Sequence, residues 1–202
     1  HLIHGRQKKF PVTDINFLKA HGKGIIATSA CLGGMISKYI LNNDISGAET
    51  IVKEFSSIFD EFYLEVQPLE MTEQLLVNAE LVKMSQRLNV PLVISSDSHY
   101  INETDSKYHD ILKDIAHQIK FSTSAHMRTP EEMEDYCIKW NIPLEALYNT
   151  GKIANQCNAN IKPKNNRYLL PVYDCPVGYT EETYLRKLSF DKLQEKMVKN
   201  KI

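Results

Sequence analysis

The stretch from Val90 to Tyr100 constrains the fold of this chain more than any other. Val90 to Ile94 is an apolar run, long enough for one buried strand and too short for a typical helix. Asp97 and His99 follow two residues apart, so in extended backbone both side chains leave the same face at the carboxyl end of the strand. In a parallel α/β protein that edge holds the chemistry, and these groups suit a divalent ion such as zinc or manganese, or an acid–base pair. The alternative is a strand end with a capping Asp and a surface His.

The segments before this stretch alternate between strand and helix patterns. Gly24–Ser29 and Phe62–Gln67 have the apolar content of short strands. Apolar residues recur at helical spacing from Asp44 to Phe59 and again from Thr72, a good N-cap, to Leu88. This alternation predicts an α/β fold with a parallel sheet and right-handed crossovers. A complete barrel of parallel strands needs about eight, so these three would form only part of one.

The side-chain pattern of these elements predicts which faces are buried. Within Phe62–Gln67, Tyr63 and Glu65 share one face, and the apolar Leu64 and Val66 share the other. Glu65 therefore points where Asp97 does, unless it is a solvated or Arg-paired carboxylate. In the helix ending at Leu88, the expected buried residues are Leu75, Leu76, Ala79 and Val82.

A tight loop, Ala30–Gly34, follows the first predicted strand. Its paired glycines indicate close backbone approach or positive φ. Cys31 lies at the same kind of strand end as Asp97, where it is either a ligand or nucleophile, or a small buried apolar residue.

A helix predicted after Tyr100 carries a second histidine, His109. It lies off the apolar stripe of that helix, so it is either partly exposed or turned toward the site. The stripe consists of Tyr108, Ile111, Leu112, Ile115 and Ile119.

The rest of the chain predicts a helical tail and a second domain. Thr129–Glu132 has the pattern of a capping box with Pro at the first helical position, and another helix follows Pro143. Composition changes after Cys157, where an Asn- and Lys-rich stretch leads into a Pro-bounded extended strap. We therefore place a domain boundary between residues 160 and 161.

Thr180 is the predicted cap of a final helix. Six residues from Arg186 to Lys201 are basic against two acidic ones. Such a face is either solvated or in contact with nucleic acid, in which case Arg186 and Lys187 are candidates.

Composition excludes some classes of protein. The 202 residues carry a net charge of -1, so the overall charge does not indicate nucleic-acid or membrane binding. The four cysteines are widely spaced, which argues against a zinc ribbon or a disulfide scaffold and favours a reducing, cytoplasmic setting. No apolar run is long enough to span a membrane, and there is no Gly-rich phosphate loop.

Taken together, the segments resemble one family in their order along the chain. The chain is similar to the polymerase alpha subunits of bacterial DNA polymerase III, over the second half of their PHP (polymerase and histidinol phosphatase) domain and the entry to the palm. Nearly the whole chain is covered. The matching stretches are Gly24–Gly34, Phe62–Gln67, Pro91–Tyr100, Asp105, His109–Leu112, Thr129–Met133, Ala146–Thr150, Ile153–Ala154 and Tyr184–Leu188.

The resemblance implies a fold, a site and partners. Residues 1–160 would be the C-terminal part of a distorted PHP barrel of seven strands, and residues 161–202 the linker and first helix of the palm. The family's late metal motif maps onto Asp97 and His99, and its loop cysteine onto Cys31; Glu65 and His109 would support these ligands. The metal would be zinc, manganese or magnesium, serving a phosphoesterase or 3'-5' exonuclease. The parent protein would use DNA, dNTPs and magnesium, with replisome partners such as the sliding clamp.

Part of that pattern is missing, which keeps alternatives open. The early His-x-His pair of the family would precede residue 1, and the magnesium-binding palm carboxylates would follow Ile202, so we expect no polymerisation by this piece alone. A partial barrel would leave an open sheet edge and favour aggregation. The alternatives are a free-standing PHP phosphoesterase and a non-catalytic PHP scaffold.

Overall fold

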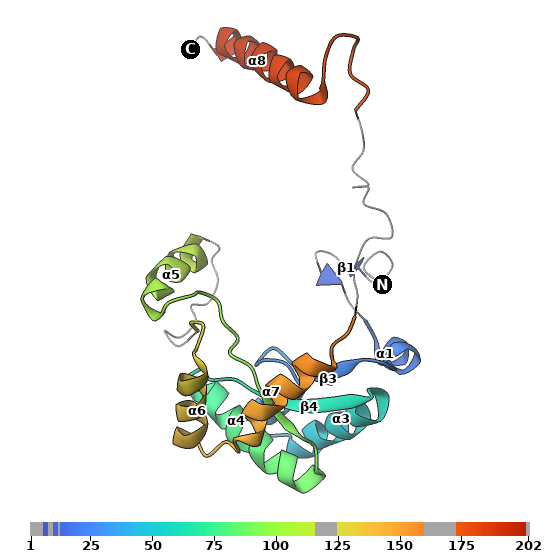
Figure 1. Cartoon of the computed structure of the whole chain (residues 1–202), viewed down its shortest axis with the longest axis vertical. Coiled ribbons are helices and arrows are strands. Elements are labelled where there is room, and N and C mark those ends of the chain that lie inside the picture. Colours follow the sequence, from blue (N-terminus) through green and yellow to red (C-terminus); the bar gives the residue numbers. More distant parts are fainter. Residues whose placement is uncertain (1–5, 8–9, 12, 116–124, 160–172, 201–202) are drawn as a thin grey trace. The chain divides into compact units, whose positions relative to one another are not determined.

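The computed structural model describes residues 6–7, 10–11, 13–115, 125–159 and 173–200 (Figure 1). The chain divides into two compact units, His1–Asn158 and Ala159–Ile202. The first unit contains β1 (Arg6–Gln7), β2 (Phe10–Pro11), α1 (Ile15–His21), β3 (Ile26–Thr28), α2 (Met35–Leu41), α3 (Ile45–Ile58), β4 (Glu61–Val66), α4 (Thr72–Leu88), β5 (Leu92–Ile94), η1 (Glu103–Asp105), α5 (Ser106–Ile115), α6 (Pro130–Lys139) and α7 (Glu145–Gln156). The second contains α8 (Glu181–Asn200).

A parallel sheet of three strands, in the order β3-β4-β5, forms the centre of the first unit. Ala27 pairs with Phe62 across β3 and β4, and Leu64 pairs with Leu92 across β4 and β5. The predicted mixed α/β fold with parallel strands is therefore confirmed. The outer strands are shorter than predicted, because β3 begins at Ile26 and β5 at Leu92, two residues later than the apolar runs indicated.

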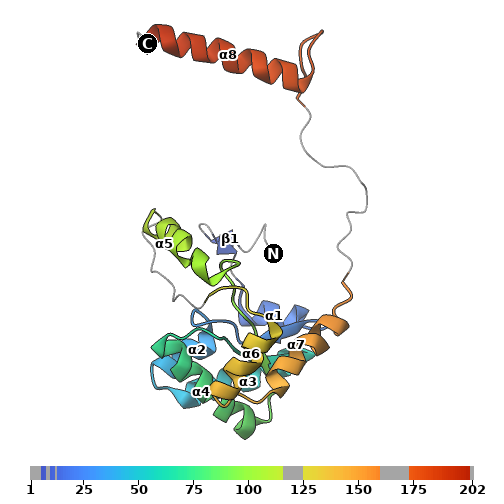
Figure 2. The same cartoon turned by 60° about the vertical axis from the view of Figure 1, so that its left-hand side comes forward.

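Helices cover the sheet and complete the core. α4 and α3 pack against β4, and α2 packs against both helices (Figure 2). α3 begins at Asp44, whose carboxylate accepts the Gly47 amide at 2.8 Å, as expected of an N-cap. Large side chains with no more than 1% exposure fill the core; they are Ile36, Val52, Leu64, Val66, Val77, Leu81, Met84 and Ile94.

The buried face of α4 differs from the prediction. Leu76 is 52% exposed, whereas Gln74 and Asn78 are 1% and 3% exposed. Asn78 donates from Nδ2 to the Gln67 carbonyl at 2.8 Å and accepts from Gln74 Nε2 at 2.8 Å. The side chain of Asn78 thus meets hydrogen-bonding needs that an apolar residue would leave unmet, so a polar face of the helix can be buried. The helix also starts at Thr72 itself, which is therefore not the N-cap.

The same network includes a buried tyrosine from α6. Asn78 Nδ2 donates to the Tyr136 hydroxyl at 3.3 Å, and that hydroxyl donates to the Gln67 carbonyl at 3.4 Å. Burial raises the pKa of Tyr136 to about 12. α6 is therefore joined to α4 and to the end of β4 by polar contacts inside the core. Its N-terminus has the predicted capping box, with Thr129 and Glu132 in their expected roles.

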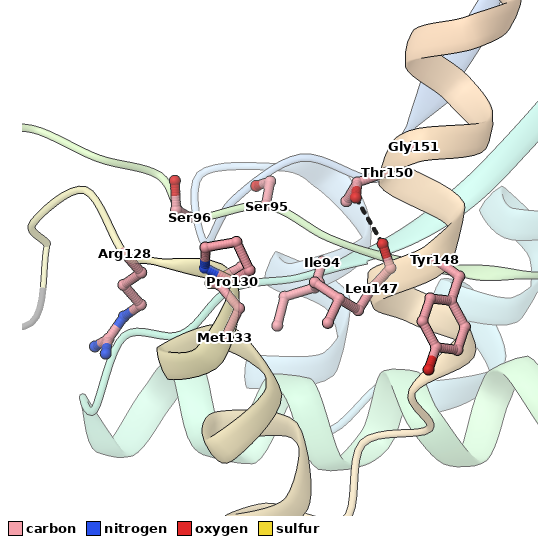
Figure 3. A pocket seen from close by; sticks show the side chains of 10 residues that line it. All are labelled: Ile94, Ser95, Ser96, Arg128, Pro130, Met133, Leu147, Tyr148, Thr150 and Gly151. Atoms are coloured by element: carbon pink, nitrogen blue, oxygen red, sulfur yellow. Dashed lines mark hydrogen bonds between the residues drawn. The ribbon is translucent and has the colours of Figure 1, made fainter.

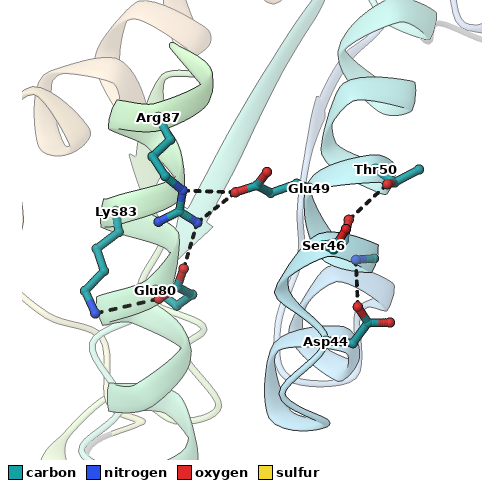
Figure 4. Close-up of polar contacts among 8 residues, drawn as sticks. Asp44, Ser46, Glu49, Thr50, Glu80, Lys83 and Arg87 are labelled. Carbon is teal, nitrogen blue, oxygen red and sulfur yellow. Dashed lines mark hydrogen bonds and ion pairs between the residues drawn. The ribbon is translucent and has the colours of Figure 1, made fainter.

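An ion network fixes α3 against α4 on their outer surface. Arg87 Nη2 lies 2.9 Å from Glu49 Oε1 on α3 and 2.8 Å from Glu80 Oε1 on α4, and Lys83 lies 3.7 Å from the second oxygen of Glu80 (Figure 4). Hydrogen bonds to Glu80 and Glu49 raise the pKa of Arg87. One guanidinium therefore bridges two helices, although exposed pairs of this kind contribute less than about 1 kcal/mol each.

A helix covers the outer edge of β5. Because Pro91 and Ser95 bond to β4, the backbone groups of Leu92 face the opposite edge. Asn149 on α7, only 8% exposed, donates from Nδ2 to the Leu92 carbonyl at 2.8 Å. α7 thus occupies this edge in place of a further strand and blunts it. The sequence predicted an open sheet edge, and the edge of β5 next to α7 is not open in this way.

Candidate functional site

The carboxyl ends of β3, β4 and β5 lie together because the three strands are parallel. Thr28 ends β3, Val66 ends β4 and Ile94 ends β5. The loops after β3 and β5 carry the predicted ligands Cys31 and Asp97. The expected site therefore falls at the sheet edge where α/β proteins place their chemistry.

Glu65 is the centre of the polar contacts at this edge. Its Oε2 accepts from the Thr28 hydroxyl at 2.5 Å, and its Oε1 accepts from the Ser95 hydroxyl at 2.5 Å and from Gln67 Nε2 at 2.9 Å. Its backbone amide donates to Ser29 Oγ at 2.8 Å. The ends of all three strands are joined through this one residue. The sequence predicted that Glu65 and Tyr63 share one face of β4. Glu65 is half-buried, whereas Tyr63 is fully buried.

The loop after β3 turns sharply and exposes Cys31. Ala30 has φ 61°, in the left-handed region that few residues other than glycine adopt. A Cβ on Gly34 would lie 2.7 Å from the Ser29 carbonyl oxygen and 3.0 Å from that of Cys31. Gly34 therefore has the close backbone approach that the sequence predicted, whereas a Cβ on Gly33 would meet nothing nearer than 3.7 Å.

The loop after β5 does not continue the strand as the two-residue spacing assumed. β5 ends at Ile94, and Asp97 has φ 45°, so Asp97 and His99 are not side chains of one extended strand. A different contact brings them together: His99 Nδ1 donates to the Asp97 carbonyl oxygen at 2.8 Å. With the proton on Nδ1, the lone pair lies on Nε2, which is a form in which histidine binds metals.

His109 on α5 is partly exposed, and its ring lies beside that of His99. The ring centroids of His99 and His109 are 5.4 Å apart, and the Tyr100 ring lies 5.6 Å from that of His109. Desolvation, with smaller effects of His99 and Lys113, lowers the pKa of His109. Its imidazole is therefore favoured in the neutral form. Four apolar residues of the α5 stripe are exposed, and Ile119 lies outside the described residues; the four are Tyr108, Ile111, Leu112 and Ile115.

The donor types at this edge suit a divalent ion, but their number is small. A thiolate, a carboxylate and an imidazole are all metal ligands, and zinc accepts each of them. Within the described ranges, however, no three His, Cys, Asp or Glu side chains lie close enough to hold one ion. The residues present therefore fit a metal in kind, and those that the structure describes do not by themselves assemble a complete site.

A groove of about 640 Å³ runs beside the same strand end (Figure 3). Its lining comes from Ile94 and the two serines after β5, from the start of α6 and from α7. Arg128 lies at one end, where its Nη2 donates to the Pro68 carbonyl at 3.0 Å and its guanidinium stacks 5.8 Å from the Tyr136 ring. The groove is mainly apolar, and its lining residues with hydroxyl groups are Ser95, Ser96, Tyr148 and Thr150.

Sequence reasoning missed the hydroxyl groups that surround Glu65. The strand patterns by themselves assign no role to Thr28, Ser29 or Ser95. One signal was available, since a Thr-Ser pair ends one predicted strand and a Ser-Ser pair follows another. Such pairs beside a strand carboxylate can donate to it from both neighbouring strands.

The second unit carries the predicted basic candidates on α8. Lys187 Nζ lies 2.6 Å from Asp191 Oδ2, which raises the pKa of Lys187, and the Arg186 guanidinium lies 5.9 Å from the Phe190 ring. Thr180 caps this helix as predicted, accepting the Thr183 amide at 3.2 Å. Among the helices that the structure describes, α8 included, none is long and apolar enough to cross a membrane.

Comparison with known proteins identifies relatives along almost the whole chain. Residues 1–68 match the family model of the PHP domain. DNA polymerase III subunit alpha of Borreliella burgdorferi is 35% identical over 195 residues, which cover 91% of this chain and 17% of that protein. The same subunit of Aquifex aeolicus is 33% identical over 93% of this chain, and that of Thermus aquaticus 31% identical over 89%.

These matches confirm the resemblance predicted from the sequence. The chain is related to the alpha subunits of bacterial DNA polymerase III, and its first third matches the PHP domain family. It spans about one sixth of the length of these relatives. Cys31 and Glu65 lie inside the part that matches the PHP model, whereas Asp97 and His99 lie after it.

Proposed function

We propose that this chain is a segment of the alpha subunit of a bacterial DNA polymerase III. Residues 1–160 would be the C-terminal part of its PHP barrel, and residues 161–202 the linker and first helix of the palm. The observation that carries the proposal is the similarity to such subunits over 89–93% of the chain. The proposed boundary lies two residues from the division between the two compact units.

The activity of the longer protein follows from this proposal. It would synthesise DNA from dNTPs in the cytoplasm, with magnesium held by palm residues outside this segment and with the sliding clamp among its replisome partners. Arg186 and Lys187 on α8 would contact DNA, although the ion pair of Lys187 with Asp191 at 2.6 Å would have to open for that contact.

We also propose that Cys31, Asp97 and His99 hold a divalent metal in the longer protein, where these side chains would lie closer together than in this structure and other parts of the protein would supply the remaining ligands. Zinc suits this donor set best, and manganese or magnesium are the alternatives. The ion would generate hydroxide and stabilise charge on a phosphodiester, for phosphoesterase or 3'-5' exonuclease activity. The contact of His99 Nδ1 with the Asp97 carbonyl fixes the ring, and His109 supports it from α5.

One observation favours a second candidate, the non-catalytic PHP scaffold. Within the described part of the chain no three potential ligands form a cluster, which is what a PHP domain without a bound ion would show. A free-standing phosphoesterase of the same superfamily is disfavoured, because the similarity to polymerase subunits extends over 93% of the chain in the Aquifex relative.

Metal analysis of the intact longer protein tests the site. We expect bound metal in the unmutated protein and its loss in Asp97→Ala and His99→Ala. His21→Ala is a matched control, since His21 is also exposed and its Nδ1 also donates to a backbone carbonyl, that of Phe17 at 2.9 Å. Absence of metal from the unmutated protein would leave the scaffold, and primer extension by the same sample would test the polymerase assignment separately.

A further inference from the structure

The two loops that carry the proposed ligands are fixed in the same way. Ser29 precedes Cys31 by two residues, and Ser95 precedes Asp97 by two residues. The amide of Ser29 donates to the Tyr63 carbonyl at 3.0 Å, and the amide of Ser95 donates to the Val66 carbonyl at 3.1 Å. Each loop therefore leaves the sheet from a serine that is bonded to β4.

Glu65 adds a second bond to each of these anchors. Its amide donates to the Ser29 hydroxyl at 2.8 Å, and its carboxylate accepts from the Ser95 hydroxyl at 2.5 Å. The carboxylate also accepts from Thr28, the residue before Ser29, at 2.5 Å. Because β4 lies between β3 and β5, Glu65 is the residue that reaches both loop anchors at once.

Both loops then contain a residue with unfavourable backbone geometry. Ala30 has φ 61° directly after Ser29, and Asp97 has φ 45° two residues after Ser95. For residues other than glycine, the left-handed region costs about 1 kcal/mol or more and persists where the surroundings hold it in place. These turns direct Cys31 and His99, so their geometry depends on firm anchors just before them.

We propose that Glu65 is a positioning residue that sets the spacing of the Cys31 and Asp97 loops. The identity of those loops as the metal-binding loops rests on the proposed function. Glu65 acts through Thr28, Ser29 and Ser95, whose roles follow from their contacts with it. In this role the carboxylate serves as a hydrogen-bond acceptor, and its negative charge is secondary.

Glu65→Gln tests whether Glu65 acts as a hydrogen-bond acceptor or as a metal ligand. Glutamine has the same size as glutamate and can still form hydrogen bonds, but it carries no charge. In Glu65→Gln, Oε1 still accepts from Ser95 and Gln67, and the new amide donates to Thr28 once that hydroxyl turns round. We expect the metal affinity of the intact longer protein to stay within about fivefold of the unmutated value. In Glu65→Ala both side-chain ties are lost, and we expect a loss of about 10–100-fold, as for residues that orient metal ligands.

Glu61→Ala is the matched control. Glu61 lies on the same strand and accepts from three side chains at the opposite edge, those of Tyr63, Lys152 and Gln156. Its removal should leave metal affinity unchanged. If Glu65→Gln loses as much affinity as Glu65→Ala, the charge is what matters, and the positioning role is replaced by direct ligation. Equal losses in Glu61→Ala and Glu65→Ala would mean that both act only through general stability.

Hydrogen exchange on the metal-free intact protein tests the inference without any metal. Glu65→Ala should speed amide exchange in both loops, over residues 30–34 and 96–99, while Glu61→Ala should not. Unchanged exchange in either loop would overturn the proposal, whatever the metal measurements show. Conversely, faster exchange in both loops with no metal in the unmutated protein would retain the positioning role and reject the proposed metal site.

Discussion

The two ends of β4 carry the same type of side chain in different surroundings. At the amino end, Glu61 accepts from the Tyr63 hydroxyl, from Gln156 Nε2 at 2.7 Å and from the Lys152 ammonium at 3.3 Å. At the carboxyl end, the partners that the structure describes for Glu65 are two hydroxyls and an amide. One carboxylate is paired with a cation, and the other is held by neutral donors.

This difference indicates that the amino end of β4 has a structural role and that the carboxyl end is the candidate functional end. The hydrogen bond from Tyr63, together with Gln156 and Lys152, lowers the pKa of Glu61, and the cluster attaches the last turns of α7 to β4. At the carboxyl end, the partners that the described residues supply to the Glu65 carboxylate are neutral hydroxyl and amide donors. The carboxylate of Glu65 there accepts hydrogen bonds from both neighbouring strands, which is the support that the loops of the proposed metal site require.

The largest expected effect on stability comes from removing core packing in the middle of β4, between Glu61 and Glu65. Leu64 is fully buried, so Leu64→Ala should lower the free energy of unfolding by about 2–5 kcal/mol through lost packing and a cavity. Denaturant unfolding and hydrogen exchange of the first unit measure this, and both ends of β4 should lose protection together. Leu76→Ala is the control, since Leu76 is 52% exposed on α4 and should change stability by less than about 0.5 kcal/mol. Similar losses in the two variants would contradict the observed core.

A smaller change should act on the amino end alone. Tyr63→Phe removes a buried hydroxyl that bonds to Glu61 and lies 3.2 Å from Lys152 Nζ. We expect a loss of about 0.5–1.5 kcal/mol and faster exchange at the end of α7. Ser95→Ala is the counterpart at the carboxyl end, and it should speed exchange in the loop after β5 instead. If either variant loosens both ends equally, the two clusters are not independent.

Local signals in the sequence predicted much of the fold. Thr129, Pro130 and Glu132 define the start of α6 because capping depends on a few neighbouring residues. The end of α4 was equally clear, since Asn89 takes the left-handed conformation expected of a helix C-cap. The alternation of strand and helix patterns likewise predicted a parallel sheet, which β3, β4 and β5 form.

Features that depend on distant partners were not predictable in this way. α4 buries Asn78 because Gln67 and Tyr136 lie opposite it, and those partners are far apart in sequence. Asp97 leaves the strand direction because β5 has already ended, which the spacing to His99 does not reveal. The site follows the same rule, since Glu65 matters through contacts on two neighbouring strands.

The smallest expected effect is a pH dependence at the amino end of β4. The pKa of Glu61 in the folded protein lies below its ordinary value of 4.5, chiefly because of the Tyr63 hydroxyl. A carboxylate with a lowered pKa binds protons more weakly in the folded state, so its contribution to stability is complete above about pH 4.5 and is lost as the pH falls through the lowered value.

Glu61→Gln keeps the size of the side chain and removes this titration. The difference in free energy of unfolding between the unmutated protein and Glu61→Gln should therefore be constant from about pH 7 to pH 5 and should shrink below about pH 4.5. Taking the difference cancels carboxylates that both proteins share, such as Glu132, whose pKa is also lowered. A difference that stays constant in acid, or that grows, would show that Glu61 is not stabilised as a carboxylate. The contrast between the charged end and the neutral end of β4 would then fail.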